Sequence, residues 1–445
     1  MAIAKYLSDK ELCYPIQQTR EYIEATLYVQ DYLFYCAVIE DSHPNTDLLK
    51  SSKWDSAKEQ CLTEVFQCKT DDELKIALQR LDAVLEDSHT NVSMKLNQED
   101  VSFPFGVAWF NNKLHVVCLA KCDSAHWGKE VVAINDISIS ALLTKTKNLF
   151  GGENEPVHQN RLCNTILSCR NRLLFRRLGL PVETADFAIT LADGTILEAK
   201  PEETCYERSL EHPVTKRKNA SYKTWYNHKV AYLQLNSMTK PLEKAAKEFD
   251  NFFDSVRQKQ LQTVVIDLRH NDGGSSLIGD MLLQRIAHKP ITNRHSVHIG
   301  VSRLSKLLYP NILPYLQNTR QVGEVLADYD IPEEEKFSGQ VYFFQGVGSY
   351  SSAEMLLSLV HDGGLYPTVG EPSRQKSCSY GDILSFRLPN TGIAAGVSFK
   401  YFIRPDAALC PEDYLYPSVY IPYTLEDYKA GNDPCWSWVL KQAEK

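Results

Sequence analysis

The chain has 445 residues, of which 43% are hydrophobic and 23% charged, and its formal net charge is −8. This composition is typical of a folded protein of two or three domains, and it excludes long disordered regions. Because the net charge is negative and no run of five Lys or Arg occurs, we expect neither nucleic acid nor an anionic membrane surface as a partner.

No apolar run approaches the roughly 18–20 residues that a membrane-spanning helix needs, so no membrane span is predicted. Charges at Lys5, Asp9 and Lys10 leave no room for the apolar core of a signal peptide. We therefore expect a cytoplasmic protein, or a secreted or periplasmic one if a signal peptide has been removed.

Twelve cysteines are spread from Cys13 to Cys435, and no two of them have Cys-x-x-Cys spacing. This distribution favours buried free thiols over a disulfide framework. No His lies at ligand spacing from a Cys pair, so no metal site is predicted, and no other cofactor is expected.

The first predicted unit, residues 1–97, has a helical pattern in which Tyr and Leu residues recur at threes and fours. Its last helix is predicted over 71–85 and ends in a polar elbow, 86–90, that contains Ser88 and His89. A His in such a loop is most often solvated or locally hydrogen-bonded. Imidazole is nevertheless the usual general base near neutral pH, so His89 is a candidate catalytic residue.

The second predicted unit, residues 98–200, is a β-rich module with helices. Two short strands meet at Asn111 and Asn112, which is typical of a hairpin. The segment 128–136 resembles a strand of a PDZ-like domain, and a helix is predicted to follow it. The polar stretch 200–223 has no periodicity and is expected to be a linker.

The third predicted unit, residues 224–445, changes to an alternation of strands and helices. Strands 230–235 and 263–268 flank an amphipathic helix, an order that predicts parallel pairing through a right-handed crossover. The second strand runs into Gly273 and Gly274. Open α/β sheets place ligand sites at such strand ends, although two glycines also suit an ordinary turn.

A third buried strand, 341–344, leads through a Gly-rich turn to Ser351, where a helix begins. The spacing from Ser351 to Glu354 predicts a capping box, in which the two side chains satisfy free N–H groups of the first helical turn. A hydroxyl at a helix start is also suited to nucleophilic catalysis, because nearby backbone N–H groups can hold a developing oxyanion. The two roles are compatible.

Three segments together resemble the tail-specific, or C-terminal processing, serine peptidase family, most closely its tricorn-core and retinoid-binding-protein-like branch. They are Asp-Leu-Arg-His-Asn-Asp-Gly-Gly (267–274), Ser-Tyr-Ser-Ser-Ala-Glu (349–354) and Gly-Glu-Pro with a following Lys (370–376). The resemblance covers about residues 80–425. It implies an α/β fold with a Clp/crotonase-like spiral catalytic core, preceded by the N-terminal helical region and the PDZ-like module.

The function that the resemblance implies is that of a serine endopeptidase of the tail-specific type, which cleaves peptide or protein substrates through an acyl-enzyme. Its nucleophile corresponds to Ser351. The oxyanion hole would consist of the backbone N–H of Ser352 and that of Gly273 or Gly274. The oligomeric state stays open.

Two residues are candidates for the base. His89, preceded by Ser88, matches the tricorn-like branch, whereas Lys376 has the position of the base in the processing-peptidase branch. The residues that depart from the pattern of that second branch are Gln375, Ser377 and Tyr380. These departures favour His89, and so does its ordinary pKa of about 6.5, because a Lys must be strongly desolvated to act as a base at neutral pH.

Glu412 and Asp413 are the candidates for an acid that orients the His.

Two other functions compete with that of a serine peptidase. A non-catalytic ligand- or peptide-binding protein on the same fold is the alternative, whereas an α/β-hydrolase esterase is disfavoured because Ser351 lacks the glycines of a nucleophile elbow. The PDZ-like module would recognise a free peptide C-terminus.

Overall fold

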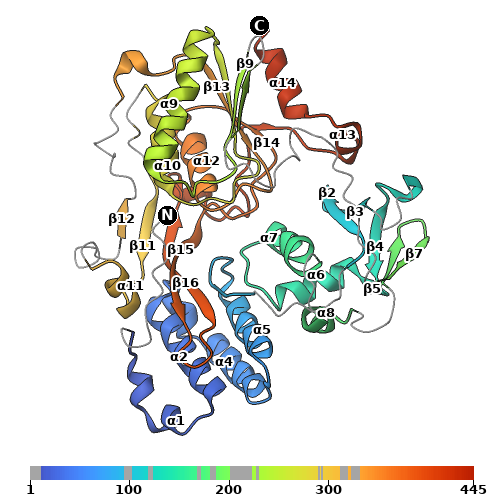
Figure 1. Ribbon diagram of the computed structural model, residues 1–445, viewed down its shortest axis with the longest axis vertical. Helices are drawn as coiled ribbons and strands as arrows, with labels where there is room; N and C mark the ends of the chain where they lie inside the picture. The colour runs from blue at the N-terminus through green and yellow to red at the C-terminus, as the bar shows by residue number, and fades with distance from the viewer. Residues whose placement is uncertain are drawn as a thin grey trace.

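The structure, a computed structural model, describes residues 12–94, 103–118, 124–167, 172–180, 187–200, 223–226, 230–288, 291, 294–310, 319–321 and 331–444. The expectations for the first eleven residues and for most of the predicted linker, 201–222, lie outside these residues. Figure 1 shows the N-terminal helices in blue, a β-rich module in cyan to green, and most of the remaining sheets and helices in yellow-green to red. Among the described helices, none is long and apolar enough to cross a membrane.

The N-terminal region folds into helices, as the periodicity predicts. Thr70 and Glu73 form a capping box at the start of the last long helix, and Glu86, with a left-handed φ of 53°, ends the short turn after it. The helices are η1 (Pro15–Gln18), α1 (Arg20–Ile23), α2 (Leu27–Ser42), α3 (Thr46–Leu49), α4 (Ser52–Val65), α5 (Asp71–Asp82) and η2 (Ala83–Leu85).

These helices share one hydrophobic core with the hairpin of strands 379–387 and 394–403, so segments far apart in the sequence fold together (Figure 1). In this core the rings of Tyr35 and Phe386 lie 5.9 Å apart. The sheet of that hairpin has the order β1-β16-β11-β12, with β15 also paired to β16. Its elements are β1 (Asn91–Val92), β11 (Ser296–Ile299), α11 (Arg303–Leu308), β12 (Thr319–Gln321), β15 (Ser379–Arg387) and β16 (Ala394–Ile403).

The β-rich module contains an antiparallel sheet of order β2-β3-β4-β6-β7, with β5 on β4. Asn111 and Asn112 both have left-handed φ values, 48° and 59°, and the predicted hairpin at this turn is confirmed. The likeness to a PDZ domain stays a prediction. The elements are β2 (Gly106–Phe110), β3 (Lys113–Cys118), η3 (Ser124–His126), β4 (Glu130–Ile134), β5 (Ile137–Ser138), α6 (Ile139–Lys147), α7 (Glu155–Asn160), the π-helix η4 (Arg161–Leu167), α8 (Arg172–Leu178), β6 (Phe187–Leu191) and β7 (Ile196–Ala199).

The third sheet has the order β17-β14-β13-β10-β9-β8, and all of its pairs except β8 with β9 are parallel, which confirms the predicted parallel pairing. Buried side chains of α9, α10 and α12 form the core with one face, and the C-terminal helix packs against the other. The elements are β8 (Lys223–Tyr226), β9 (Val230–Gln234), α9 (Leu242–Gln258), β10 (Thr263–Asp267), α10 (Ser276–Gln284), η7 (Glu333–Glu335), β13 (Gln340–Gln345), α12 (Ser352–Asp362), β14 (Thr368–Gly370), η8 (Ala407–Leu409), β17 (Val419–Tyr420), α13 (Leu425–Ala430) and α14 (Pro434–Gln442).

Two features near the C-terminus correct the sequence interpretation. Helix α14 was not predicted from the sequence; Asp433 precedes its first residue and caps it, with a side chain that accepts from the N–H of Trp436. Cys378 and Cys410 form a disulfide, with Cα atoms 5.2 Å apart. Six cysteines that the structure describes are free, and three of them, Cys36, Cys61 and Cys435, are buried as predicted; the other three are Cys13, which is exposed, and Cys68 and Cys163, which are partly exposed.

Candidate active site

The loop after β10 lies against the start of α12 because it carries two glycines. Gly273 and Gly274 have φ values of 89° and 136°, a region that L side chains rarely adopt. A Cβ atom on Gly273 would lie 2.7 Å from the Cβ of Ser351, and one on Gly274 would lie 2.3 Å from the carbonyl oxygen of Met238. The sequence leaves two roles open for these glycines, a ligand site and an ordinary turn. In the structure they allow the loop to approach the start of α12 more closely than residues with a side chain could.

Ser351 stands between β13 and α12 with φ 56° and ψ −125°. A normal N-cap residue has an extended backbone, so this left-handed conformation turns the hydroxyl away from the helix. The predicted capping box is therefore wrong: Ser351 makes no side-chain cap, and Oε1 of the buried Glu354 has no hydrogen-bond partner among the described residues. The hydroxyl of Ser351 is thus available for another contact.

That contact is with His89. Its Nε2 lies 3.2 Å from the Oγ of Ser351, within reach of a hydrogen bond. The imidazole is almost fully buried, and burial lowers the pKa of His89 below its usual value. A neutral imidazole with this geometry can accept the proton of the serine hydroxyl.

Asp87 fixes the elbow that carries His89. Its two carboxylate oxygens accept the N–H of His89 at 2.8 Å and the N–H and hydroxyl of Thr90 at 3.1 and 2.5 Å. On the other side Nε2 of His43 lies 3.4 Å from the carboxylate. Burial alone would raise the pKa of Asp87, but its contacts with His43, His89 and Thr90 hold that pKa well below the usual range.

A chain of polar side chains leads away from the other ring nitrogen of His89. Nδ1 lies 3.1 Å from the hydroxyl of Tyr350, which bonds to the hydroxyl of Ser88. Ser88 donates to Oε1 of Glu153 at 2.8 Å through its hydroxyl and at 3.2 Å through its backbone N–H. Burial raises the pKa of Tyr350 well above its usual value, so the phenol keeps its proton.

The end of this chain determines its direction. Oε1 of Glu153 accepts, so the hydroxyl of Ser88 donates to it, the phenol of Tyr350 donates to Ser88, and Nδ1–H of His89 donates to the phenol. The assigned tautomer of His89 therefore leaves the lone pair of Nε2 for Ser351.

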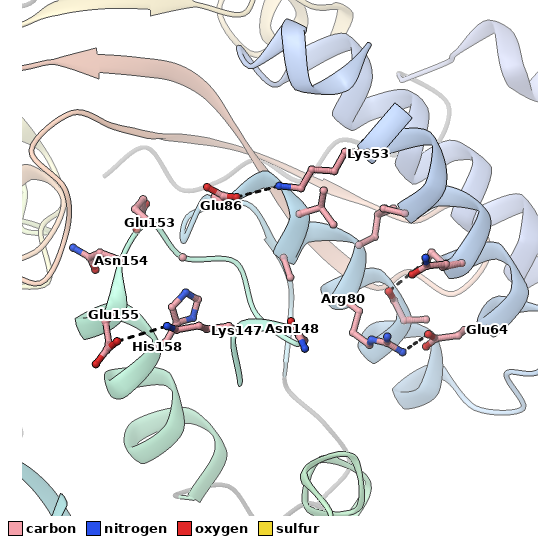
Figure 2. A pocket seen from close by; sticks show the side chains of 18 residues that line it. Lys53, Glu64, Arg80, Glu86, Lys147, Asn148, Glu153, Asn154, Glu155 and His158 are labelled. Atoms are coloured by element: carbon pink, nitrogen blue, oxygen red, sulfur yellow. Dashed lines mark hydrogen bonds and ion pairs between the residues drawn. The ribbon is translucent and has the colours of Figure 1, made fainter. Parts of the chain in front are cut away.

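Glu153 is half-buried beside α7, and burial together with the nearby Asp87 raises its pKa to about 7. Its second oxygen, Oε2, has no hydrogen-bond partner among the described residues. The residue borders a cavity of about 630 Å³ between the helices α4 and α5 and the segment from α6 to α7 (Figure 2). Figure 2 also shows the ion pairs Lys53–Glu86 and Lys147–Glu155 among the residues that line it.

Asp87, His89 and Glu153 are the trio of described side chains that could in principle hold a metal ion, because their ligand atoms lie within 4.8 Å of one another. Hydrogen bonds to Ser351, Tyr350, Ser88 and Thr90 already use most of these atoms. We therefore assign the trio to hydrogen bonding.

The other predicted site residues lie elsewhere. The ammonium of Lys376 lies 2.8 Å from a carboxylate oxygen of Asp413, and Glu412 lies 3.6 Å from the guanidinium of Arg404. Among the described contacts, none joins Lys376, Glu412 or Asp413 to Ser351 or His89. The structure thus brings His89 and Ser88 to Ser351, and pairs Lys376 with one of the two acids.

Two backbone N–H groups are free to hold an oxyanion. The N–H of Gly273 donates to Oδ1 of Asn271 at 2.8 Å, which leaves those of Gly274 and Ser352 without a hydrogen-bond partner among the described residues. The hydroxyl of Ser352 donates to the carbonyl oxygen of Gly274 at 2.7 Å and so ties the two segments together.

Four residues of this site were missed in the sequence: Asp87, Glu153, Tyr350 and Gln375, whose Oε1 accepts the N–H of Ser351 at 2.7 Å. Asp87, Tyr350 and Gln375 stand directly beside predicted site residues, and this adjacency is a signal that could have found them. Glu153 had no local signal, because its contact with Ser88 spans 65 residues.

Residues 229–407 match peptidase family S41. No curated protein sequence is detectably similar to the chain. Among solved structures, the chain is similar to mature CPAF, with 13% identity, a TM-score of 0.65, and coverage of 94% of this chain and 96% of that one. Mature CPAF complexed with lactacystin gives 13% identity, a TM-score of 0.63, and coverage of 94% and 97%. At this identity the likeness shows that the fold is shared.

Proposed function

We propose that this chain, whose residues 229–407 match peptidase family S41, is a serine-type peptidase that cleaves internal peptide bonds with Ser351 as nucleophile and His89 as general base. The observation that carries the proposal is the 3.2 Å contact between Nε2 of His89 and Oγ of Ser351. A hydroxyl is a weak nucleophile at its own pKa, and an adjacent base activates it.

In the proposed reaction His89 takes the hydroxyl proton while Oγ of Ser351 attacks the carbonyl carbon of the substrate. The oxyanion is held by the N–H groups of Gly274 and Ser352, each of which can contribute about 2.7–4 kcal/mol. The imidazolium then donates its proton to the leaving amine, and an acyl-enzyme remains on Ser351. Water, deprotonated by His89, hydrolyses this ester.

Glu153 takes the part in this proposal that the sequence interpretation gave to Glu412 or Asp413. Through Ser88 and Tyr350 it fixes the proton of His89 on Nδ1 and stabilises the imidazolium that forms. Asp87 supports the same charge more directly, because a carboxylate oxygen lies 3.9 Å from Nδ1.

The tail-specific type of peptidase is the finer part of the proposal. It is supported by the resemblance of the three sequence segments and by the antiparallel sheet of residues 106–199, whose outer strands β2 and β7 could accept a peptide by strand addition. Amidating the C-terminus of a cleaved peptide should raise the Michaelis constant at unchanged kcat. Equal constants for the acid and the amide would contradict this type.

Labelling with a fluorophosphonate probe tests the proposed nucleophile and base. The wild-type chain should be labelled, Ser351→Ala should not, and His89→Ala should be labelled at least a hundredfold more slowly. Lys376→Ala is the matched control, because its ammonium pairs with Asp413, and it should label at the wild-type rate. Labelling of Ser351→Ala at the wild-type rate would refute the nucleophile, and the absence of labelling in all forms would favour the binding-protein alternative.

A further inference from the structure

Arg374 reaches the ring of Tyr350 from the loop between β14 and β15. Its guanidinium carbon lies 4.6 Å from the centre of that ring, within the range of a cation–π contact. The ring of Tyr350 in turn lies 4.8 Å from that of His89, and the two planes differ by 17°. Tyr350 is therefore packed against two flat groups, the guanidinium and the imidazole.

The loop that carries Arg374 is firmly held. The neighbours of Arg374, Ser373 and Gln375, are buried, and the N–H and the hydroxyl of Ser373 donate hydrogen bonds of 3.2 Å to backbone carbonyl oxygens. Gln375 accepts the N–H of Ser351. Two adjacent residues of this loop thus contact Tyr350 and Ser351, which are also adjacent.

The hydroxyl of Tyr350 has to meet Nδ1 of His89 and the hydroxyl of Ser88 at the same time. A small turn of the ring would take its hydroxyl out of reach of Nδ1, which is already 3.1 Å away. We propose that Arg374 is a positioning residue, which holds the ring of Tyr350 against His89 so that the phenol accepts the hydrogen bond of Nδ1–H. This inference rests on the proposed function.

An ion pair sets the direction of the guanidinium. Its Nη2 lies 3.0 Å from a carboxylate oxygen of Asp272, which directly precedes Gly273 in the loop of the proposed oxyanion donor Gly274. The side chain of Arg374 is 11% exposed, whereas that of Asp272 is 80% exposed. Because water weakens a pair with so exposed an acid, the ion pair orients Arg374 and adds little stability.

The charge of Arg374 also acts on His89. Burial is the main cause of the low pKa of His89, and the positive charges of Arg161 and Arg374 lower that pKa further. Three acidic groups act on the ring from its own elbow, from β15 and through the hydrogen-bonded series of Ser88 and Tyr350: Asp87 and Asp382, which raise the pKa of His89, and Glu153. Loss of the charge of Arg374 should therefore raise the pKa of His89 and increase its protonated fraction at acidic pH.

The rate of fluorophosphonate labelling at pH 8 tests this inference on the full-length chain. Arg374→Met removes the charged plane and should lower the rate about 5–30-fold, whereas Arg374→Lys keeps a charge without the plane and should lower it about 2–5-fold. In the Tyr350→Phe background, which lacks the positioned hydroxyl, either change should cost less than about twofold more. If Arg374→Met does not fold, Arg374→Lys carries the same comparison.

The pH dependence separates the charge of Arg374 from its shape. Arg374→Met should increase the ratio of the labelling rate at pH 8 to that at pH 5.5 by about twofold or more, and Arg374→Lys should leave this ratio unchanged. Lys376→Met is the matched control, because it removes a cation two residues away that pairs with Asp413 at 2.8 Å. It should keep both the rate and the ratio within about twofold of wild type.

The outcomes distinguish this inference from the proposed function. Wild-type rates in both Arg374 variants, or losses of equal size with and without the hydroxyl of Tyr350, would overturn the positioning role. The proposed function would still stand if Ser351→Ala abolishes labelling. Absence of labelling in every form, or undiminished labelling of Ser351→Ala, would refute the proposed function and this inference with it.

Discussion

The backbone N–H of Ser351 donates a hydrogen bond of 2.7 Å to Oε1 of Gln375. Gln375 is itself held by a 2.5 Å bond from its amide nitrogen to the hydroxyl of Ser379. The residue next to the predicted Lys base therefore holds the backbone of the proposed nucleophile, in a conformation that is sparsely populated for any residue with a side chain.

Removal of this hold should reduce activity more than stability. We expect Gln375→Ala to lower kcat about 10–100-fold, because the strained turn at Ser351 relaxes and a partly buried N–H loses its acceptor, at a cost of about 1–3 kcal/mol. Steady-state kinetics with a peptide substrate measures the loss. Lys376→Ala changes the adjacent residue and should keep kcat within twofold; an equal loss in both variants would contradict the role of Gln375.

Glu153 should impose a titration on the reaction. Above pH 7 its carboxyl is ionised and stabilises the imidazolium through Ser88 and Tyr350, so kcat/KM should rise as the pH passes through about 7. Glu153→Gln should remove this rise and lower kcat/KM at pH 8 roughly tenfold, since a hydrogen bond to a charged acceptor is about 1–1.5 kcal/mol stronger than one to a neutral acceptor. A pH–rate profile from 5 to 9 measures both effects.

Tyr350→Phe tests the middle of the hydrogen-bonded series from Glu153 to His89, because it keeps the ring and removes the hydroxyl. It should also remove the rise near pH 7, and the double variant with Glu153→Gln should lose little more than either single one. Additive losses would show that the two residues act separately.

Burial of Glu354 should make the free energy of unfolding depend on pH. Burial raises the pKa of this carboxyl to about 8 from a usual 4.5, so between these values the folded state keeps a proton that the unfolded state releases. The free energy of unfolding should therefore fall as the pH rises through this window, by up to about 1.4 kcal/mol per pH unit from this group. Denaturant unfolding of the wild type and of Glu354→Gln at pH 5 and 8 checks this, and the wild type should lose more stability than the variant.

Gly273→Ala should abolish activity. Its Cβ would collide with the Cβ of Ser351, and the residue would also have to keep a φ of 89°. Gly392→Ala is the matched control: it has a φ of 67° but no atom within 4 Å of the added Cβ, so it should lose about 1 kcal/mol of stability and keep its activity. Thermal melting and peptide hydrolysis separate the two effects, and activity in Gly273→Ala would contradict the tight approach.

The sequence was most informative where function and fold depend on local patterns. The order strand, helix, strand over residues 230–268 predicted the parallel pairing, and the neighbours of Ser351 predicted a helix start. Spacing alone could not show that the backbone at Ser351 is left-handed, so the capping box was expected and does not form.

Contacts between segments that are distant in the sequence could not be predicted from the sequence. Glu153 lies on the β-rich module, and only the packing of that module against the elbow at Ser88 brings its carboxyl to the site. Lys376 has the spacing of a base, but the position of Asp413 draws its ammonium elsewhere. Sequence spacing can therefore suggest which side chain has the position of a base. The partner that this side chain contacts depends on the tertiary packing around it.

The strand after His89 has a consequence for how the protein is made. Asn91 and Val92 pair with Gly396 and Ala395 of β16, and His89 and Ser351 are 262 residues apart. During synthesis, His89 emerges from the ribosome long before β16, the strand that pairs with the residues directly after it. The proposed catalytic pair can form only after Ser351 and the partner strand β16 have been synthesised. At about 5–20 residues per second, this is tens of seconds after His89. A nascent copy of the chain is therefore expected to lack the proposed catalytic pair until β16 has been synthesised.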